Sequence, residues 1–324
     1  MASLCAAGTS YATWSTPMVP FYIFYSMFGF QRTGDLIWAF GDLRGRGFML
    51  GGTAGRTTLN GEGLQHEDGH SLVLASTVPN LRAYDPAFAY ETAEIIRDGI
   101  QRMYCTDFSS SDGDCFYYLT LYNENYVMPP LPASEPDGID VRDGIIRGLY
   151  PFAPAPEGKR RRATILFSGS ACQAAIEAQR MLADEWDCGA ELWSATSYKA
   201  LREDALAIER TNRLHPTRPA ETPYVTRLLD QSEGPVVAVT DFMKAVPDMI
   251  SRWVPRPFVP LGTDGYGRSD TRAALRRHFE TDAAHVTVAV LSALASEGEA
   301  KDAEVAEAIA RYGIDPDAPD PLGA

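Results

Sequence analysis

The chain has 324 residues, 45% of them hydrophobic and 22% charged, and a formal net charge of −14. These values are typical of a soluble globular protein with room for two domains, and the acidic balance argues against binding to nucleic acid or to an acidic membrane surface. No apolar run reaches the length of a membrane span, and the N-terminus lacks the basic segment of a secretory signal. Five cysteines, an odd number without a C-x-x-C pair, predict a reduced, cytoplasmic protein.

The first half of the chain alternates between candidate helices and candidate strands. Residues 2–14 form a small-residue helical pattern with no capping residue before it. This is the pattern of a chain that begins inside a helix, so we expect a true N-terminus elsewhere or a preceding segment from another polypeptide. The apolar run at 18–25 predicts a parallel strand buried on both faces. Further strands are predicted at 48–51, 81–84 and 115–121, and helices at 32–40, 72–78 and 87–104.

Residues 128–143 are rich in proline and acidic residues, which predicts a linker. The same alternation then continues. It predicts strands at 163–168, 191–195, 236–240 and 258–261, and helices at 171–185, 200–210, 222–230, 242–253, 272–278 and 283–296, the last continuing into 302–312. Such alternation with short connections predicts an α/β fold class of two successive three-layer domains with mostly parallel sheets, at 1–127 and 144–324.

The segment 60–86 allows three interpretations. His66, Glu67 and His70 match H-E-x-x-H, the pattern in which one face of a helix holds two histidines for zinc. Glycines and an aspartate in and before the motif disfavour that helix. A polar surface loop with incidental histidines is the second interpretation. We favour the third, a glycine-rich active-site loop followed by a short helix and the strand at 81–84.

Four blocks in a fixed order carry a resemblance to a known family. They are 21–35 (FYIFYSMFGFQRTGD), 51–70 (GGTAGRTTLNGEGLQHEDGH), 120–129 (TLYNENYVMP) and 262–270 (GTDGYGRSD). They resemble thiamine-diphosphate enzymes of the transketolase superfamily, and within it the homodimeric E1 component of pyruvate dehydrogenase. The resemblance extends from near residue 1 to about residue 285. It implies that 1–127 is most of a pyrimidine-binding domain, truncated at its N-terminus, that 128–143 is a linker and that 144–324 is a transketolase-like C-terminal domain.

The resemblance implies thiamine diphosphate with Mg²⁺ as the cofactor. The family's metal motif begins with G-D-G, and the only similar sequence here, at 111–114 (SDGD), lacks the leading glycine and predicts a turn. The family's catalytic glutamate lies before the segment that begins at Met1, and no acidic residue precedes Asp35. No metal ligand is therefore assigned, and the metal and diphosphate ligands are expected outside this chain.

The resemblance assigns five site residues. Phe28 is expected to pack against the aminopyrimidine ring, and Tyr25 to bind the cofactor and face the group derived from the substrate. Arg32 would lie near the same pocket as a partner for a carboxylate. His66 is the strongest catalytic candidate, because imidazole titrates near neutral pH and can form hydrogen bonds or transfer a proton. Glu62 is a weaker catalytic candidate.

The leading hypothesis is oxidative decarboxylation of pyruvate, with reductive acyl transfer to a lipoyl group on an acyltransferase partner, in a homodimer or in a pair with a chain that carries the diphosphate-binding domain. A second hypothesis is a related 2-oxo acid such as 2-oxobutyrate, or a ketose. A third is a noncatalytic partner or pseudoenzyme half. The isolated chain is expected to be inactive.

Overall fold

The computed structural model describes residues 1–105, 113–132 and 139–323. Its first half contains, in chain order, α1 (Ala2–Gly8), α2 (Ser10–Thr13), β1 (Phe21–Tyr25), α3 (Ser26–Asp42), β2 (Phe48–Gly52), the 3-10 turn η1 (Leu64–His66), α4 (Ser71–Ser76), β3 (Leu81–Tyr84), α5 (Ala89–Tyr104) and β4 (Phe116–Leu121). The strands and helices predicted for this half are all present, and the helical pattern predicted at 2–14 forms α1 and α2. Part of the SDGD sequence, residues 111 and 112, lies outside the described residues.

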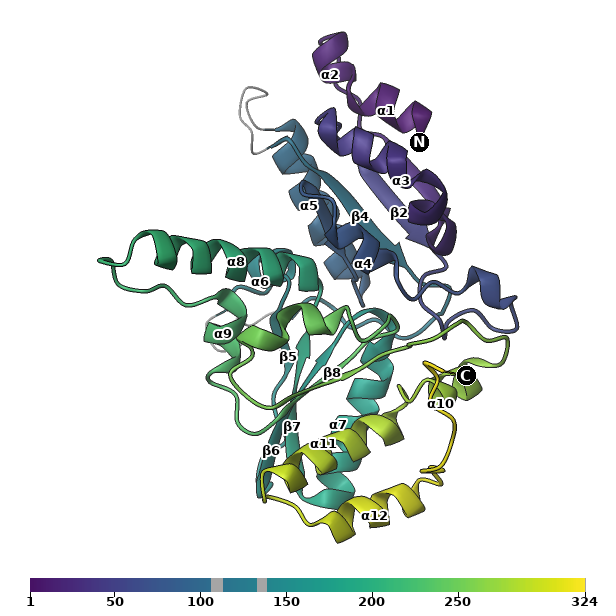
Figure 1. Cartoon of the computed structure of the whole chain (residues 1–324), viewed down its shortest axis with the longest axis vertical. Coiled ribbons are helices and arrows are strands. Elements are labelled where there is room, and N and C mark those ends of the chain that lie inside the picture. The colour runs from purple at the N-terminus through teal and green to yellow at the C-terminus, as the bar shows by residue number, and fades with distance from the viewer. Residues whose placement is uncertain (106–112, 133–138, 324) are drawn as a thin grey trace.

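The first sheet is parallel throughout, in the order β1-β2-β4-β3. Alternate residues of β4 belong to different layers of the core, because successive side chains of a strand point to opposite faces. Phe116 and Tyr118 belong to the cluster that includes residues of α1, α3 and α4. Tyr117 and Leu119 belong to the cluster that includes residues of α5. The expected three-layer arrangement is therefore present (Figure 1).

The prediction that the run at 18–25 is a strand buried on both faces is wrong. The strand is only Phe21–Tyr25, and it lies at the edge of the sheet with β2 as its one neighbour. Phe21, Ile23 and Tyr25 share one face and are 45%, 69% and 48% exposed. An apolar run of this length predicts a strand, but the order of the strands decides how much of it is covered.

The second half contains, in chain order, α6 (Val141–Arg147), β5 (Tyr150–Ala153), β6 (Arg161–Phe167), the 3-10 turn η4 (Gly169–Ala171), α7 (Cys172–Trp186), β7 (Cys188–Ser194), α8 (Tyr198–Leu214), α9 (Tyr224–Leu229), β8 (Val236–Val239), the 3-10 helix η5 (Pro247–Trp253), β9 (Phe258–Leu261), α10 (Arg272–His278), α11 (Ala283–Ser296) and α12 (Asp302–Arg311). Its sheet has the order β5-β7-β6-β8-β9, with β5 antiparallel to β7 and the other pairs parallel. The predicted α/β fold with mostly parallel sheets is thus confirmed.

Four details of the second half differ from the sequence expectations. The helix α6 and the short edge strand β5 were not predicted, and α6 overlaps the segment 128–143, of which 133–138 lie outside the described residues. Val141 and Ile145 of α6 are buried in the cluster that includes α5. The helix expected at 242–253 is a 3-10 helix that starts only at Pro247, and α11 and α12 are separate helices.

The two sheets meet at the carboxyl ends of their strands. Asp85 follows β3, and Ser168 follows β6. The Ser168 hydroxyl donates to Asp85 Oδ2 at 2.6 Å, and the Asp85 amide donates to the Thr196 carbonyl at 2.8 Å. Burial raises the pKa of Asp85, although hydrogen bonds from Ser168 and Thr120 oppose this effect. Carboxyl ends of parallel strands are where α/β folds usually bind ligands. Here the second sheet uses part of that edge to dock against the first (Figure 1).

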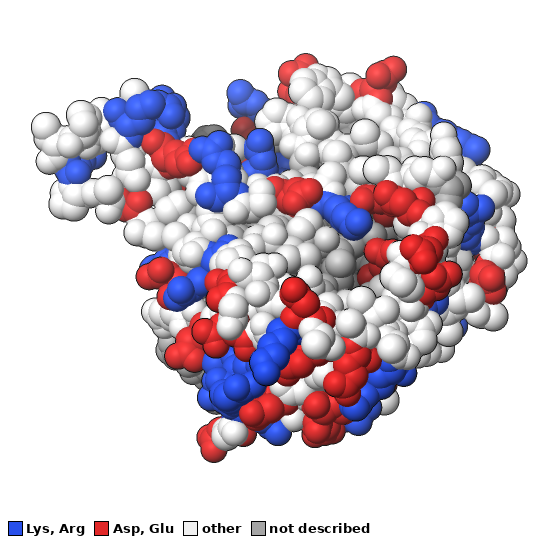
Figure 2. All heavy atoms as spheres, turned by 60° about the horizontal axis from the view of Figure 1, so that its bottom comes forward, with Lys and Arg blue, Asp and Glu red and all other residues white. Residues whose placement is uncertain are grey.

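Charged side chains of both signs are interspersed on the face that contains α7, α11 and α12 (Figure 2). Arg311 of α12, for example, lies 3.2 Å from Glu185 and 3.0 Å from Glu307. The negative net charge is therefore not gathered into a patch on this face. In the part of the chain that the structure describes, no helix is both long and apolar enough to cross a membrane.

Candidate functional site

Three rings from two separate segments meet at the carboxyl end of β1. Tyr25 is the last residue of β1, Phe28 lies in the first turn of α3, and His66 is the last residue of η1. The centroid of the His66 ring lies 5.5 Å from that of Tyr25 and 5.4 Å from that of Phe28, and the Tyr25 and Phe28 centroids are 6.2 Å apart. Because Tyr25 is about half exposed, the cluster leaves aromatic surface open to a ligand.

Arg32 and Glu62 lie at the same cluster. The Arg32 guanidinium stacks over the Phe28 ring, with its Cζ 4.1 Å from the centroid, a distance at which cation–π attraction is effective. Glu62 Oε2 lies 3.1 Å from His66 Nδ1, although the geometry is not that of a hydrogen bond. The structure thus brings all five residues singled out in the sequence into one place.

The H-E-x-x-H motif is not helical in this structure. The 3-10 turn ends at His66, and Glu67 has extended backbone angles (φ −86°, ψ 103°). Two histidines four residues apart face the same ligand only on a continuous helix, so the arrangement needed for the zinc site is missing. The glycine-rich loop, the short helix α4 and the strand β3 follow as the favoured interpretation predicted.

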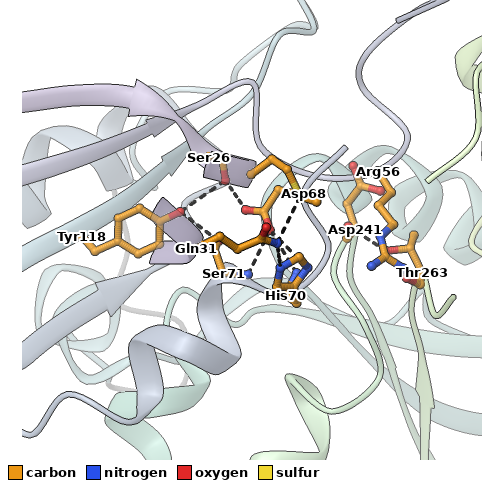
Figure 3. Close-up of polar contacts among 10 residues, drawn as sticks. Ser26, Gln31, Arg56, Asp68, His70, Ser71, Tyr118, Asp241 and Thr263 are labelled. Carbon is orange, nitrogen blue, oxygen red and sulfur yellow. Dashed lines mark hydrogen bonds and ion pairs between the residues drawn. The ribbon is translucent and has the colours of Figure 1, made fainter. Parts of the chain in front are cut away.

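Asp68 holds this loop against the start of α3 (Figure 3). Its side chain is fully buried. Oδ1 accepts from the amides of His70 and Ser71 at 3.0 and 2.9 Å, and Oδ2 accepts from the Ser26 hydroxyl. The Tyr118 hydroxyl lies 3.3 Å from that of Ser26 and 2.9 Å from that of Ser71. Ser26 directly follows Tyr25, so Asp68 joins the two segments that form the aromatic cluster.

Sequence reasoning missed this role and counted Asp68 only as a residue that disfavours a helix. A usable signal was present. An aspartate whose side chain can accept from amides two and three residues later is a common device at the start of a helix, and α4 begins at Ser71. What the sequence could not supply is the third bond, from Ser26, which lies 42 residues away.

A second buried polar group ties the loop to the other sheet. The Arg56 guanidinium donates to the carbonyl of Thr263 (Figure 3). Nearby, Asp241 Oδ1 accepts from the Thr57 amide at 3.1 Å. Burial lowers the pKa of Arg56, with Asp68 and Asp241 acting in the opposite direction. Both hydrogen bonds join opposite halves of the chain, so they were not predictable from sequence periodicity.

Asp241 is expected to make stability depend on pH. Burial raises the pKa of its carboxyl to about 7, against the opposing effect of Arg276, whereas an unfolded aspartate titrates at about 3.9. Between these values the folded protein binds more protons than the unfolded chain, so this contribution to stability is lost as pH rises from about 4 to about 7. We expect the free energy of unfolding, measured in urea, to fall more steeply with pH in the unaltered chain than in Asp241→Asn.

The exposed Asp317 provides the control, and Asp317→Asn should keep the pH profile of the unaltered chain. Parallel profiles for Asp241→Asn and the unaltered chain would contradict the assignment.

Comparison with known proteins places this chain in a family. A model of the pyruvate dehydrogenase E1 component middle domain matches residues 1–129, and a model of the transketolase-like C-terminal domain matches residues 148–282. The pyruvate dehydrogenase E1 component of Mycobacterium tuberculosis is 54% identical over 313 residues, which are 97% of this chain and 33% of that protein. The chain belongs to the pyruvate dehydrogenase E1 family.

A second relative agrees with this assignment, and a solved structure agrees with the fold. The E1 component of Pseudomonas aeruginosa is 51% identical over 323 residues, which are 99% of this chain and 35% of that protein. The chain thus spans about a third of the length of these curated relatives. A solved structure described as "Split gene transketolase, inactive beta4 tetramer" shares the fold with a TM-score of 0.59, at 18% identity, over 90% of this chain and 81% of that one.

The aromatic cluster can be tested against the cofactor that the E1 family implies. Tyr25 and Phe28 offer ring faces, and His66 Nδ1 makes no hydrogen bond to the described residues. These groups fit the aminopyrimidine end of thiamine diphosphate. The described residues contain no group of three or more histidine, cysteine, aspartate or glutamate side chains that could hold a metal ion.

Proposed function

We propose that this chain is the part of a pyruvate dehydrogenase E1-type oxidoreductase that binds the pyrimidine end of thiamine diphosphate and contacts the 2-oxo acid. The observation that carries the proposal is the meeting of Tyr25, Phe28 and His66 within about 6 Å of one another, at the edge of the sheet where α/β folds bind ligands. Family membership supports the same activity.

The residues of the cluster have distinct proposed roles. When bound, thiamine diphosphate supplies the nucleophilic carbon and the electron sink for decarboxylation. Phe28 packs against the aminopyrimidine ring, and Tyr25 packs beside it with its hydroxyl toward the substrate. Arg32 attracts the carboxylate of the 2-oxo acid. His66 donates or accepts a proton at the substrate-derived group. Glu62, whose Oε2 lies 3.1 Å from His66 Nδ1, favours the protonated imidazole through its negative charge.

The remaining parts of the proposal concern the whole protein. Residues 1–127 would form most of the pyrimidine-binding domain, truncated at its N-terminus, 128–143 the linker and 144–324 the transketolase-like C-terminal domain. The full enzyme would hold Mg²⁺ and the diphosphate with residues outside this chain, act as a homodimer and pass its acyl group to a lipoyl-bearing acyltransferase. No disulfide joins the five cysteines, which supports a reducing compartment, the cytoplasm.

The isolated chain is expected to bind thiamine diphosphate weakly or not at all, because the diphosphate and its metal carry most of the polar groups that a protein can bind. Calorimetric titration of the purified chain with thiamine diphosphate and Mg²⁺ tests this. Native purification from the source cells, with mass spectrometry, would identify the polypeptide segment or separate chain that carries the diphosphate site. Pyruvate decarboxylation by the isolated chain would contradict the expectation, and its absence from the complete assembly would overturn the proposed function.

One comparison favours a second candidate. The match to the inactive split-gene transketolase structure covers 81% of that chain. This supports a role as one half of a two-chain enzyme or as a noncatalytic partner. A separate companion chain with the diphosphate motif would establish the split form. Rates with pyruvate and 2-oxobutyrate in the complete assembly would then identify the 2-oxo acid.

A further inference from the structure

The turn at residues 62–66, which includes η1 and carries Glu62 and His66, is attached to the second half of the chain on both sides. Before the turn, the Gly61 amide donates to the Asp270 carbonyl at 3.0 Å. After it, the Arg268 amide donates to Glu67 Oε2 at 2.7 Å, and the Met243 amide donates to the Gly69 carbonyl at 2.8 Å. The position of His66 therefore depends on loops that lie 174 or more residues away from their partners in sequence, and not on its own loop alone.

Glu67 is an unusual side chain for this position. It is only 1% exposed, and its Oε1 accepts no hydrogen bond from the described residues. Its described side-chain hydrogen bond is the one from the Arg268 amide. Burial raises the pKa of Glu67 to about 7. A buried carboxyl with an unused oxygen lowers stability, so packing alone does not account for a glutamate here.

The partner loop approaches this turn so closely that it requires a glycine. A Cβ added at Gly267 would lie 2.5 Å from the carbonyl oxygen of Leu64 and 2.8 Å from Glu67 Oε2. Backbone atoms of the turn cannot move away from such a contact without moving η1, which ends at His66. The contacts with residues 267 and 268 therefore fix the distance between the turn and the second half of the chain.

We propose that Glu67 and Gly267 are positioning residues that fix how His66 lies against Tyr25 and Phe28. Glu67 holds the turn against the loop by accepting from the Arg268 amide. Gly267 allows the loop to come close enough for that amide to donate. The catalytic consequence rests on the proposed function, because it assumes that His66 acts on the substrate. The geometric claim does not, and the two can be tested separately.

The geometric claim can be measured in the full 324-residue chain by NMR with labelled histidine. The chain has five histidines, and the His66 signal is identified by its loss in His66→Ala. Its chemical shift reports the nearby rings of Tyr25 and Phe28. We expect Glu67→Ala and Gly267→Ala to move this signal, to leave that of His215 unchanged, and to speed amide exchange at 60–70 roughly tenfold.

Two variants serve as controls. Glu67→Gln keeps an acceptor for the Arg268 amide and should restore the signal. A Cβ at Gly34 of α3 would have nothing within 4 Å, so Gly34→Ala tests the effect of a glycine change by itself. If Glu67→Ala does not fold, Glu67→Asp, which keeps the carboxyl group but shortens the side chain, should still displace the signal. An unmoved His66 signal in the folded variants would overturn the proposal.

The catalytic consequence is measured in the complete enzyme. There Glu67→Ala should lower kcat for pyruvate at least about tenfold with little change in KM, because misplacement of a catalytic group acts on the transition state. A displaced His66 signal with an unchanged kcat would overturn the catalytic part of the proposal. A complete enzyme that does not decarboxylate pyruvate would overturn the proposed function instead and leave the positional result standing.

Discussion

Replacement of His66 by alanine in the complete enzyme is expected to lower turnover of pyruvate by about 100- to 10,000-fold, the range associated with loss of a positioned acid or base. The affinity for thiamine diphosphate should change little, because Phe28 and Tyr25 still provide the aromatic contacts. Steady-state kinetics and a cofactor titration of the same preparation measure the two effects. A loss of turnover without a loss of cofactor affinity distinguishes a catalytic role from a structural one.

His215 provides a matched control, because it is exposed and lies at the end of α8, in the other half of the chain. His215→Ala should retain the turnover of the unaltered enzyme. The side chain of His66 is itself 29% exposed, so its removal leaves a small cavity and should not unfold the protein. Turnover that survives in folded His66→Ala would show that the assigned role is wrong.

Replacement of Asp68 by alanine should give the largest loss of stability among the site residues. The change leaves the amides of His70 and Ser71 and the hydroxyl of Ser26 without their buried acceptor. Each unsatisfied buried donor costs about 1–3 kcal/mol, so a decrease of about 3 kcal/mol or more in the free energy of unfolding is expected. Urea unfolding of the purified chain, followed by circular dichroism, measures it.

Asp68→Asn retains the shape and an acceptor for both amides, and it should recover a large part of the lost stability. The exposed Asp317 again provides a surface control, since Asp317→Ala should stay within about 0.5 kcal/mol of the unaltered chain. An Asp68→Ala chain as stable as Asp317→Ala would mean that water replaces the carboxylate without cost, contrary to the closed network seen around Ser26 and Tyr118.

The candidate site was largely accessible from the sequence because its residues lie in short blocks. Tyr25 and Phe28 are three residues apart, and Glu62 and His66 are four apart. The resemblance of four such blocks, in one order, to a single family was enough to choose them, although their roles stay predictions. The supporting residues were not accessible in this way. Arg56 acquires its role only through contacts with the other half of the chain.

The sequence by itself determined the local elements and the fold class. Turns rich in glycine and proline, and apolar runs of strand or helix length, act over a few residues, so they mark β2, β3, β4, α5 and most later elements correctly. The composition rich in proline and acidic residues at 128–143 was a less reliable predictor, because α6 starts within this predicted linker. Only when the first sheet is assembled does Val141 have a layer of apolar residues to pack against.

Only the tertiary structure decided which of these elements would be covered and what they would contact. The apolar run that forms β1 could not reveal that this strand lies at the edge of its sheet, because strand order depends on pairing between distant segments. Likewise, Glu67 and Gly267 are 200 residues apart, and nothing local to either one indicates the other. Periodicity reports the near neighbours of a residue, whereas burial and hydrogen bonding depend on the path of the whole chain.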